Sequence, residues 1–345
     1  MKRFHILFSF LLFSLVAKAQ DIHFSQFYMA PTNLNPALTG VMNCSQRLSA
    51  NYRNQWASVL RDKAFQTYNV AYDTRIPVGR YDYIGIGGTI WGDKAGSLNF
   101  RTNQLTGAFS YSKRMGGYRK KSHYLVMGAD VGLGNRGVNT MDARWGSQND
   151  NGTWNGQLPS NENTFTRDNF IFADVSAGLL WFSVFDESNN LFIGGAYDHI
   201  NRANQSFTPD KFVPLYSKFT VHAGGEFEIK DRISLLPGAV TFLQGPYMEI
   251  NGGTSIRFLL GNSKSSSEAL QFGGWARIGN KAGGMLMDAF ILSTRFDYSN
   301  FSLGFSYDLN TSPLKAASRS NGGFEFALLY KICGNERRNV YCPNF

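Results

Sequence analysis

The stretch Phe219-Thr220-Val221-His222-Ala223-Gly224-Gly225-Glu226-Phe227-Glu228-Ile229 decides the fold of this chain of 345 residues. Apolar or small residues occupy every second position from Phe219 to Ile229, and mainly polar residues stand between them. Side chains of a β-strand point alternately to the two faces of its sheet. The pattern therefore predicts a strand that lies between an apolar and a polar environment.

The same alternation recurs along nearly the whole chain and is clear at 301–308 and at 324–330. Turn residues divide the chain into fourteen predicted strands: 47–56, 65–76, 82–92, 100–114, 123–135, 170–184, 189–201, 217–229, 233–243, 247–260, 268–279, 285–296, 300–309 and 322–332. Each reaches the roughly 9 to 11 residues that a tilted strand needs to cross a membrane, and strands of soluble sandwiches are usually shorter. The even number favours a closed antiparallel barrel.

The connections between these strands support the barrel independently. Short connections near 77–81, 185–188, 230–232 and 297–299 fall on one side, and long ones near 57–64, 136–169, 202–216 and 310–321 fall on the other. Membrane barrels with both termini in the periplasm have short periplasmic turns and longer outside loops. The tight turn Gln244-Gly245-Pro246 on the predicted outer side is the exception.

The fold class predicted is all-β: a transmembrane antiparallel β-barrel of about fourteen strands over residues 47–332. The polar strand faces suit a wet lumen, and a barrel of this size holds either a channel or a plug. Segment 20–46 and the tail 333–345 are expected in the periplasm or folded into the lumen. Within 20–46, Asn35 is predicted to cap a short helix that Pro36 begins and Gly40 ends.

The first residues predict export to the outer membrane. Lys2 and Arg3 precede the apolar run 6–16 and the small-residue site Ala17-Lys18-Ala19, which together resemble a secretory signal peptide over residues 1–19. The apolar run is too short to span a bilayer. The residue after the predicted cleavage site is Gln20 rather than a cysteine, so no lipid anchor is expected there.

The net charge of the chain argues against one class of partner, nucleic acid. Cleavage would remove Lys2, Arg3 and Lys18 and lower the net charge from +9 to +6. The chain has no long run of basic residues, so no nucleic-acid partner is expected.

An exported chain can form disulfides, and a bridge between Cys333 and Cys342 is predicted, with Cys44 unpaired. We expect no metal and no cofactor: 149–152 lacks the acidic residues of a calcium loop.

Catalysis is not predicted. A serine hydrolase in a barrel wall would need a serine, a histidine and a polar orienting group close together. His222 is expected to face the lumen beside Glu226, but polar residues line the lumen of any such barrel. In the longest predicted loop, Trp145, Trp154 and Phe165 either anchor a partner or close the loop on itself, and both interpretations stay open.

Motifs along the chain resemble those of the PorP/SprF family. They begin with Asp21-Ile22-His23-Phe24-Ser25-Gln26-Phe27-Tyr28 and 35–40. They continue with Tyr52-Arg53-Asn54-Gln55-Trp56, Leu236-Pro237, Gln244-Gly245, Trp275-Ala276-Arg277, Ser306-Tyr307-Asp308, Gly323-Phe324-Glu325 and Cys342-Pro343-Asn344-Phe345. The resemblance covers essentially the whole predicted mature chain.

The resemblance implies a Bacteroidota outer-membrane component of the type IX secretion and gliding machinery. It implies a role in exporting, or attaching at the surface, an adhesin-like partner with a type IX C-terminal domain, together with other secretion components in the outer membrane and periplasm. Residues expected to contact partners are His23, Phe24, Gln26, Asn35, Pro36, Trp145, Trp154 and Phe165. A porin or a transporter of hydrophobic solutes is the alternative, because the same strand count would serve either.

Overall fold

The computed structural model describes residues 21–117, 121–161, 167–186, 188–260, 268–281, 284–313, 315–333 and 342–343. The predicted signal peptide, Phe165 and most of the predicted tail lie outside the described residues. Within the described ranges, no helix is both long and apolar enough to cross a membrane.

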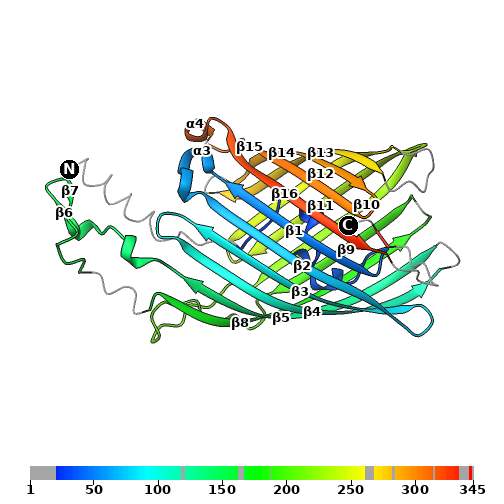
Figure 1. Ribbon diagram of the computed structural model, residues 1–345, viewed down its shortest axis with the longest axis horizontal. Coiled ribbons are helices and arrows are strands. Elements are labelled where there is room, and N and C mark those ends of the chain that lie inside the picture. Colours follow the sequence, from blue (N-terminus) through cyan, green and yellow to red (C-terminus); the bar gives the residue numbers. More distant parts are fainter. Residues whose placement is uncertain are drawn as a thin grey trace.

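Fourteen antiparallel strands form one closed barrel (Figure 1). They are β1 (Gln46–Gln55), β2 (Phe65–Val78), β3 (Asp82–Ala95), β4 (Phe100–Gly116), β5 (Ser122–Gly137), β8 (Asn169–Val184), β9 (Asn190–Asp198), β10 (Lys218–Lys230), β11 (Ile233–Gln244), β12 (Tyr247–Leu259), β13 (Ala269–Lys281), β14 (Gly284–Tyr298), β15 (Phe301–Asn310) and β16 (Asn321–Ile332). Each strand pairs with its neighbours in the sequence, and β1 pairs with β16 to close the barrel. The predicted fold class and strand count are confirmed.

The alternation that predicted the strands also sorts their side chains. On β10, Phe219 and Val221 point outward and are half exposed, whereas Thr220 and His222 point inward and are 1% exposed. An apolar outer surface of this kind is what the hydrocarbon of a bilayer requires. The barrel wall therefore has the two environments that the sequence pattern predicts.

The connections differ between the two ends of the barrel as predicted, except that 96–99, like the predicted exception at 245–246, is a short connection at the end with the long loops. The turns at 79–81, 231–232 and 299–300 join strands at the end where β1 begins, which we call the terminal end. The connections at 56–64, 138–168, 199–217 and 311–320 gather at the opposite end, the long-loop end. One of them carries the small hairpin of β6 (Asn149–Asp150) and β7 (Thr153–Trp154), which projects beyond the barrel (Figure 1).

Residues 21–44, the lumen segment, pass through the inside of the barrel (Figure 1). The segment begins near the long-loop end, where the Asp21 N–H donates to Gln244 Oε1 (2.9 Å), and reaches β1 at the terminal end. It contains three short turns of helix: η2 (Phe27–Met29), α2 (Pro31–Leu34) and η3 (Pro36–Leu38). As predicted, Asn35 caps the last turn, because its Oδ1 accepts the N–H of Ala37 (2.8 Å). Gly40 follows with a φ of +71°.

The apolar core of the molecule lies between the lumen segment and the wall. Leu34, Leu38 and Val41 pack into one cluster with wall residues that include Tyr124 and Phe182. The rings of Tyr124 and Phe182 stack at 5.1 Å between their centroids. Burial of apolar surface contributes roughly 25 cal/mol per Å². The lumen segment therefore belongs to the folded core.

The predicted disulfide between Cys333 and Cys342 is wrong. Cys44 bonds to Cys333, with their Cα atoms 4.3 Å apart, and Cys342 is a buried free thiol. Cys44 comes just before β1 and Cys333 directly after β16, so closure of the barrel brings them together. Cys342 instead turns into the terminal end of the lumen, where its N–H donates to Asn43 Oδ1 (2.5 Å) and its Sγ lies 3.5 Å from Tyr83 Oη.

Candidate functional site

The structure separates the sequence-predicted site residues into two groups. Phe24, Gln26, Asn35 and Pro36 are buried in the lumen segment, and His23 lies beside them near the long-loop end. Trp145 and Trp154 lie in the connection between β5 and β8, outside the barrel. Trp154 is 45% exposed, its Nε1 donates to Gln148 Oε1 (3.2 Å), and the guanidinium of Arg144 lies 5.0 Å above its ring.

Four motifs that are far apart in the sequence converge on Ser25 of the lumen segment. The carboxylate of Asp308 accepts Arg277 Nη1 (2.7 Å), Arg53 Nη2 (3.1 Å) and Ser25 Oγ (2.9 Å). Arg277 Nη2 also donates to Ser25 Oγ (2.6 Å). Glu325 accepts the backbone N–H of Ser25 (2.7 Å) and that of the next residue (3.0 Å). We call Arg53, Arg277, Asp308 and Glu325 the charge cluster.

Because the charge cluster is buried, it determines where the lumen segment lies. All four side chains belong to residues no more than 4% exposed. A buried charge is tolerated only when it is paired and hydrogen-bonded, and loss of one partner costs about 3–5 kcal/mol. The segment supplies hydrogen-bond partners that the wall charges would otherwise lack. Its first turn is therefore fixed to β1, β13, β15 and β16.

The middle of the lumen segment is held by Asn35. Its Nδ2 lies 3.0 Å from Leu179 O, 3.1 Å from Gly195 O and 3.0 Å from His222 Nε2. His222 thus contacts the segment. The backbone of the segment also lies directly on wall glycines: a Cβ at Gly178 would overlap Asn35, and a Cβ at Gly128 would overlap Ala37. The segment is seated on the wall, with no space for larger wall residues.

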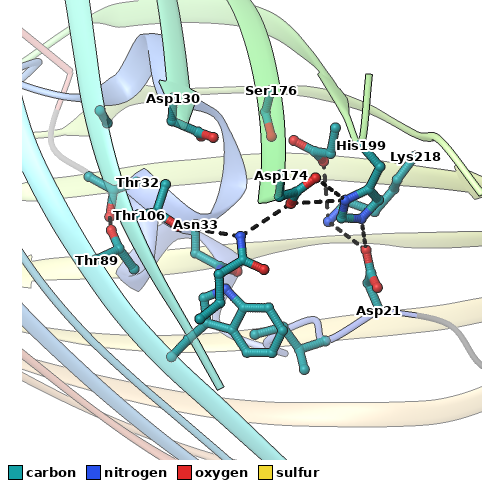
Figure 2. Close-up of a pocket in the computed structure, with 15 residues that line it drawn as sticks. Asp21, Thr32, Asn33, Thr89, Thr106, Asp130, Asp174, Ser176, His199 and Lys218 are labelled. Carbon is teal, nitrogen blue, oxygen red and sulfur yellow. Dashed lines mark hydrogen bonds and ion pairs between the residues drawn. The ribbon is translucent and has the colours of Figure 1, made fainter. Parts of the chain in front are cut away.

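His199, directly after β9, fastens the beginning of the lumen segment (Figure 2). Its Nδ1 bonds to Asp174 of β8 (2.8 Å), and its Nε2 bonds to Asp21. Burial alone would lower the pKa of His199, but the carboxylates of Asp21 and Asp174 outweigh it and raise that pKa from 6.5 to about 10. Burial likewise opposes ionisation of Asp21, yet the neighbouring cations hold its pKa well below the usual range. The imidazolium therefore links Asp21 to Asp174, and we call these three residues the ion triad.

A small polar cavity lies beside this ion triad. It has a volume of about 50 Å³ and is lined by Asp130, Asp174, Ser176 and Lys218, among others (Figure 2). A cavity needs at least about 10–15 Å³ for each water, so it has room for a few waters. In the part of the chain that the structure describes, no group of His, Cys, Asp and Glu is arranged to hold a metal ion.

A larger cavity, the vestibule, opens toward the long-loop end. Its volume is about 370 Å³. Residues 21–23 of the lumen segment form its inner boundary, and Leu215 of the connection 199–217 lies on one side. The other lining residues come from the five strands β1 to β5. They are Arg53, Gln55, Phe65, Thr67, Trp91, Asp93, Ala95, Phe100, Thr102 and Arg136. Within the described part of the chain, His23 is the one site residue predicted from the sequence that lines the vestibule.

His23 is held neutral in this position. Burial lowers its pKa well below the ordinary value, and the positive charges of Arg53 and Arg277 lower it further. Its contact with Glu249 (3.4 Å from Nε2 to Oε1) is therefore not an ion pair. Its carbonyl oxygen accepts Arg53 Nη1 (2.5 Å). His23 thus fixes the boundary of the vestibule through its backbone.

Sequence reasoning missed His199, the charge cluster as a unit, and Arg136. The four residues of the cluster do occur in the motifs that carried the family resemblance. An inward-facing Arg, Asp or Glu on a strand of a barrel is a signal for a buried partner, because an unpaired charge there is costly. The identity of the partner does not follow from the strand pattern, since it comes from a segment outside the strands.

Several solved outer-membrane barrels are similar to this chain in fold. The Pseudomonas putida toluene transporter TodX has 10% sequence identity and a TM-score of 0.47, over 92% of this chain and 93% of that one. The Ralstonia pickettii toluene transporter TbuX has 12% identity and a TM-score of 0.43, over 88% and 94%. CdiB from Acinetobacter baumannii has 9% identity and a TM-score of 0.44; the match covers 84% of this chain and 60% of CdiB. These values support no inference about function. No curated protein matches.

The sequence itself matches a known family over most of its length. The matching family is described as "Type IX secretion system membrane protein PorP/SprF", and the match covers residues 16–330. That range includes the lumen segment, all four residues of the charge cluster and nearly the complete barrel wall. The chain therefore belongs to the PorP/SprF family of type IX secretion membrane proteins and is an outer-membrane β-barrel of that secretion system.

Proposed function

We propose that this barrel is a non-enzymatic, non-conducting scaffold of the type IX secretion system that supports the export or surface attachment of a secreted, adhesin-like protein. The observation that carries this proposal is the lumen segment. It is bonded to the wall at Asp21, Ser25 and Asn35, and it fills the interior with buried side chains. A protein whose lumen is occupied by its own chain is suited to binding at its ends.

The long-loop end is the proposed partner surface. By analogy with other outer-membrane barrels, long connections face the outside and short turns face the periplasm. At this end Met141, Trp154 and Phe212 expose 95%, 45% and 71% of their surfaces. Exposed apolar side chains on connecting loops favour a protein contact. The secreted partner would carry a type IX C-terminal domain, which this end of the barrel would hold.

The terminal end is the proposed contact with the periplasmic part of the machinery. The chain of the lumen segment enters β1 there, and Cys342 and Pro343 return to the same place. Other type IX components would therefore meet the disulfide region and the tail, while the strands meet lipid. Export through a cleaved signal peptide at residues 1–19 belongs to the same proposal.

Affinity purification tests the proposal most directly. The full chain, tagged in a long-loop connection, is solubilised gently from the outer membrane, and the proteins that co-purify are identified. We expect a secreted protein with a type IX C-terminal domain, and we expect that protein to leave the cell surface when the barrel is deleted and to return on complementation.

The rival function has a different outcome in a planar bilayer. A porin or a transporter of hydrophobic solutes would conduct ions or pass solutes as the wild-type protein, and its deletion would leave surface adhesins in place. That combination would overturn the scaffold proposal. Lipid hydrolysis abolished by replacement of His222 would overturn its non-enzymatic part.

A further inference from the structure

We infer that the vestibule is a binding site for an aromatic side chain that stands next to a carboxylate in a polypeptide partner. The inference rests on the proposed function only for the source of that polypeptide, a secreted protein held at the long-loop end. The chemistry of the site is argued from the residues that line it. Its size of about 370 Å³ lies within the range of roughly 300–1,000 Å³ that is usual for ligand pockets.

One part of the vestibule is apolar and aromatic. Phe65, Trp91 and Phe100 line it from three neighbouring strands, and Ile22 and Leu215 complete the apolar surface. Phe65 is 38% exposed. Aromatic rings attract other rings in offset or edge-to-face arrangements, which contribute about 0.5–1.5 kcal/mol beyond the burial of area. This surface therefore favours an aromatic group over a polar one.

The lining is also rigid. The connection 199–217 is fixed by Phe207, whose ring lies 5.0 Å from that of Phe170 and 6.2 Å from that of Phe100. Residues 21–23 are fixed by the ion triad at His199 and by Arg53. A preformed site binds with a smaller loss of conformational entropy than one that must be ordered.

Arg136 supplies the positive charge. Its guanidinium lies between Phe100 and Phe172, with 5.6 Å to each ring centroid, and its Nε donates to Thr102 Oγ1 (3.0 Å). Among the residues that the structure describes, no carboxylate forms an ion pair with it. Arginine binds carboxylates through two parallel hydrogen bonds. An aromatic residue with a neighbouring carboxylate complements both parts of the vestibule.

The other charged residues of the lining have hydrogen-bond or ion-pair partners of their own, and Asp21 and Asp93 lie close enough to Arg136 for their charges to act on it. Arg53 pairs with Asp308, and Asp21 bonds to His199. Asp93 accepts the hydroxyl of Thr67 (2.6 Å). Asp93, Thr102 and Arg136 stand opposite one another on β3, β4 and β5, so the backbones at Asp93 and Arg136 are two strand spacings, or about 10 Å, apart. Asp93 therefore orients the ligand, because its charge repels a carboxylate away from β3.

The test uses the purified full-length barrel in detergent and two small probes. N-acetyl-L-phenylalanine carries the ring and the carboxylate, and N-acetyl-L-phenylalaninamide carries only the ring. Binding is measured by ligand-observed NMR and calorimetry. We expect the carboxylate probe to bind about tenfold more tightly than the amide, as a charge-assisted hydrogen bond implies.

Two substitutions with opposite expected effects on the affinity for the carboxylate probe complete the test, because misfolding would lower the affinity in both variants. Arg136→Gln should lower the affinity for the carboxylate probe to that of the amide, and Asp93→Asn should raise the affinity for the carboxylate probe. Arg144→Gln is the matched control, because Arg144 stacks on Trp154 outside the vestibule, and it should change neither affinity. Equal affinity of wild-type protein for both probes, no binding of either, or no effect of Arg136→Gln would overturn the inference.

Partner capture separates this inference from the proposed function. If Arg136→Gln abolishes probe binding and also reduces capture of the secreted partner, both are supported. If capture stays at the wild-type level, the vestibule is not where the partner's aromatic group binds, although the scaffold function stands. If the wild-type barrel captures no secreted protein, the proposed function fails, whatever the probes show.

Discussion

Cys44 and Cys333 covalently join the two strands that close the barrel. The bond links residues 289 apart in the sequence, and the loop that it closes contains all fourteen strands of the wall. Crosslinking so long a loop restricts the unfolded chain, which in the chain-entropy model stabilises a protein by several kcal/mol, with about 2–4 kcal/mol typical of measured disulfides. The bond also holds β1 beside β16 at the terminal end.

Replacing both Cys44 and Cys333 with serine should lower the temperature at which the barrel unfolds. The measurement is heat-modifiable electrophoretic mobility in detergent, with and without reductant. Reductant should bring the wild-type protein to the unfolding temperature of the double variant and should leave the double variant unchanged.

Cys342→Ser is the matched control for this pairing. It removes the third cysteine and keeps the bond, so the variant should still respond to reductant. If Cys342→Ser abolished the response while Cys44→Ser kept it, the pairing would be Cys333 with Cys342, as the sequence alone predicted.

Breaking the charge cluster should release the start of the lumen segment. Arg277→Ala leaves Asp308 and Glu325 with Arg53 as their remaining cation in the cluster, and removal of one partner from a buried ion pair costs about 3–5 kcal/mol. We expect faster proteolysis near residues 21–30 and a lower unfolding temperature. Arg80→Gln, in an exposed turn, should change stability by less than about 0.5 kcal/mol. Equal protease resistance of the two variants would show that the cluster does not fix the segment.

The barrel wall follows from the sequence because its signal is local. Alternation from Phe219 to Ile229 reports the two environments of one strand without knowledge of its neighbours. The cap of Asn35 on Ala37 spans two residues and is local for the same reason. The contacts of the candidate site are different. Ser25 meets Glu325 across 300 positions, and no residue pattern specifies which inward-facing charge receives which part of the lumen segment.

The ion triad at His199 predicts a pH dependence. The pKa of His199 is raised from 6.5 to about 10, so its contribution to stability is fully present below pH 6.5 and is lost as the pH rises toward 10. The pKa of Asp21 is lowered, so its contribution is present above its unfolded value of 3.8 and is lost as the pH falls below that value. Attachment of the segment should therefore be strongest between about pH 4 and 6.5.

Limited proteolysis at residues 21–30, measured from about pH 4 to about pH 10, tests the effect. Wild-type protein should become more susceptible from pH 6.5 to 10, and His199→Gln should give a flatter profile over that interval. His123→Gln is the control, because His123 bonds to Ser183 near the terminal end, away from the segment's beginning. Identical profiles for wild-type and His199→Gln protein would contradict the prediction.

Gly178 tests whether the lumen segment seals the barrel. A Cβ at this position would overlap the side-chain amide of Asn35, whose Nδ2 is held by the backbone carbonyls of Leu179 and Gly195. Gly178→Val should therefore displace the middle of the segment and allow ion conductance in a planar bilayer, whereas the wild-type barrel should stay closed. Gly107→Val on β4 is the matched control: a Cβ there meets no atom within 4 Å, so this variant should remain non-conducting. Conductance in wild-type protein, or closed behaviour of a folded Gly178→Val barrel, would mean that the segment is not what blocks the lumen.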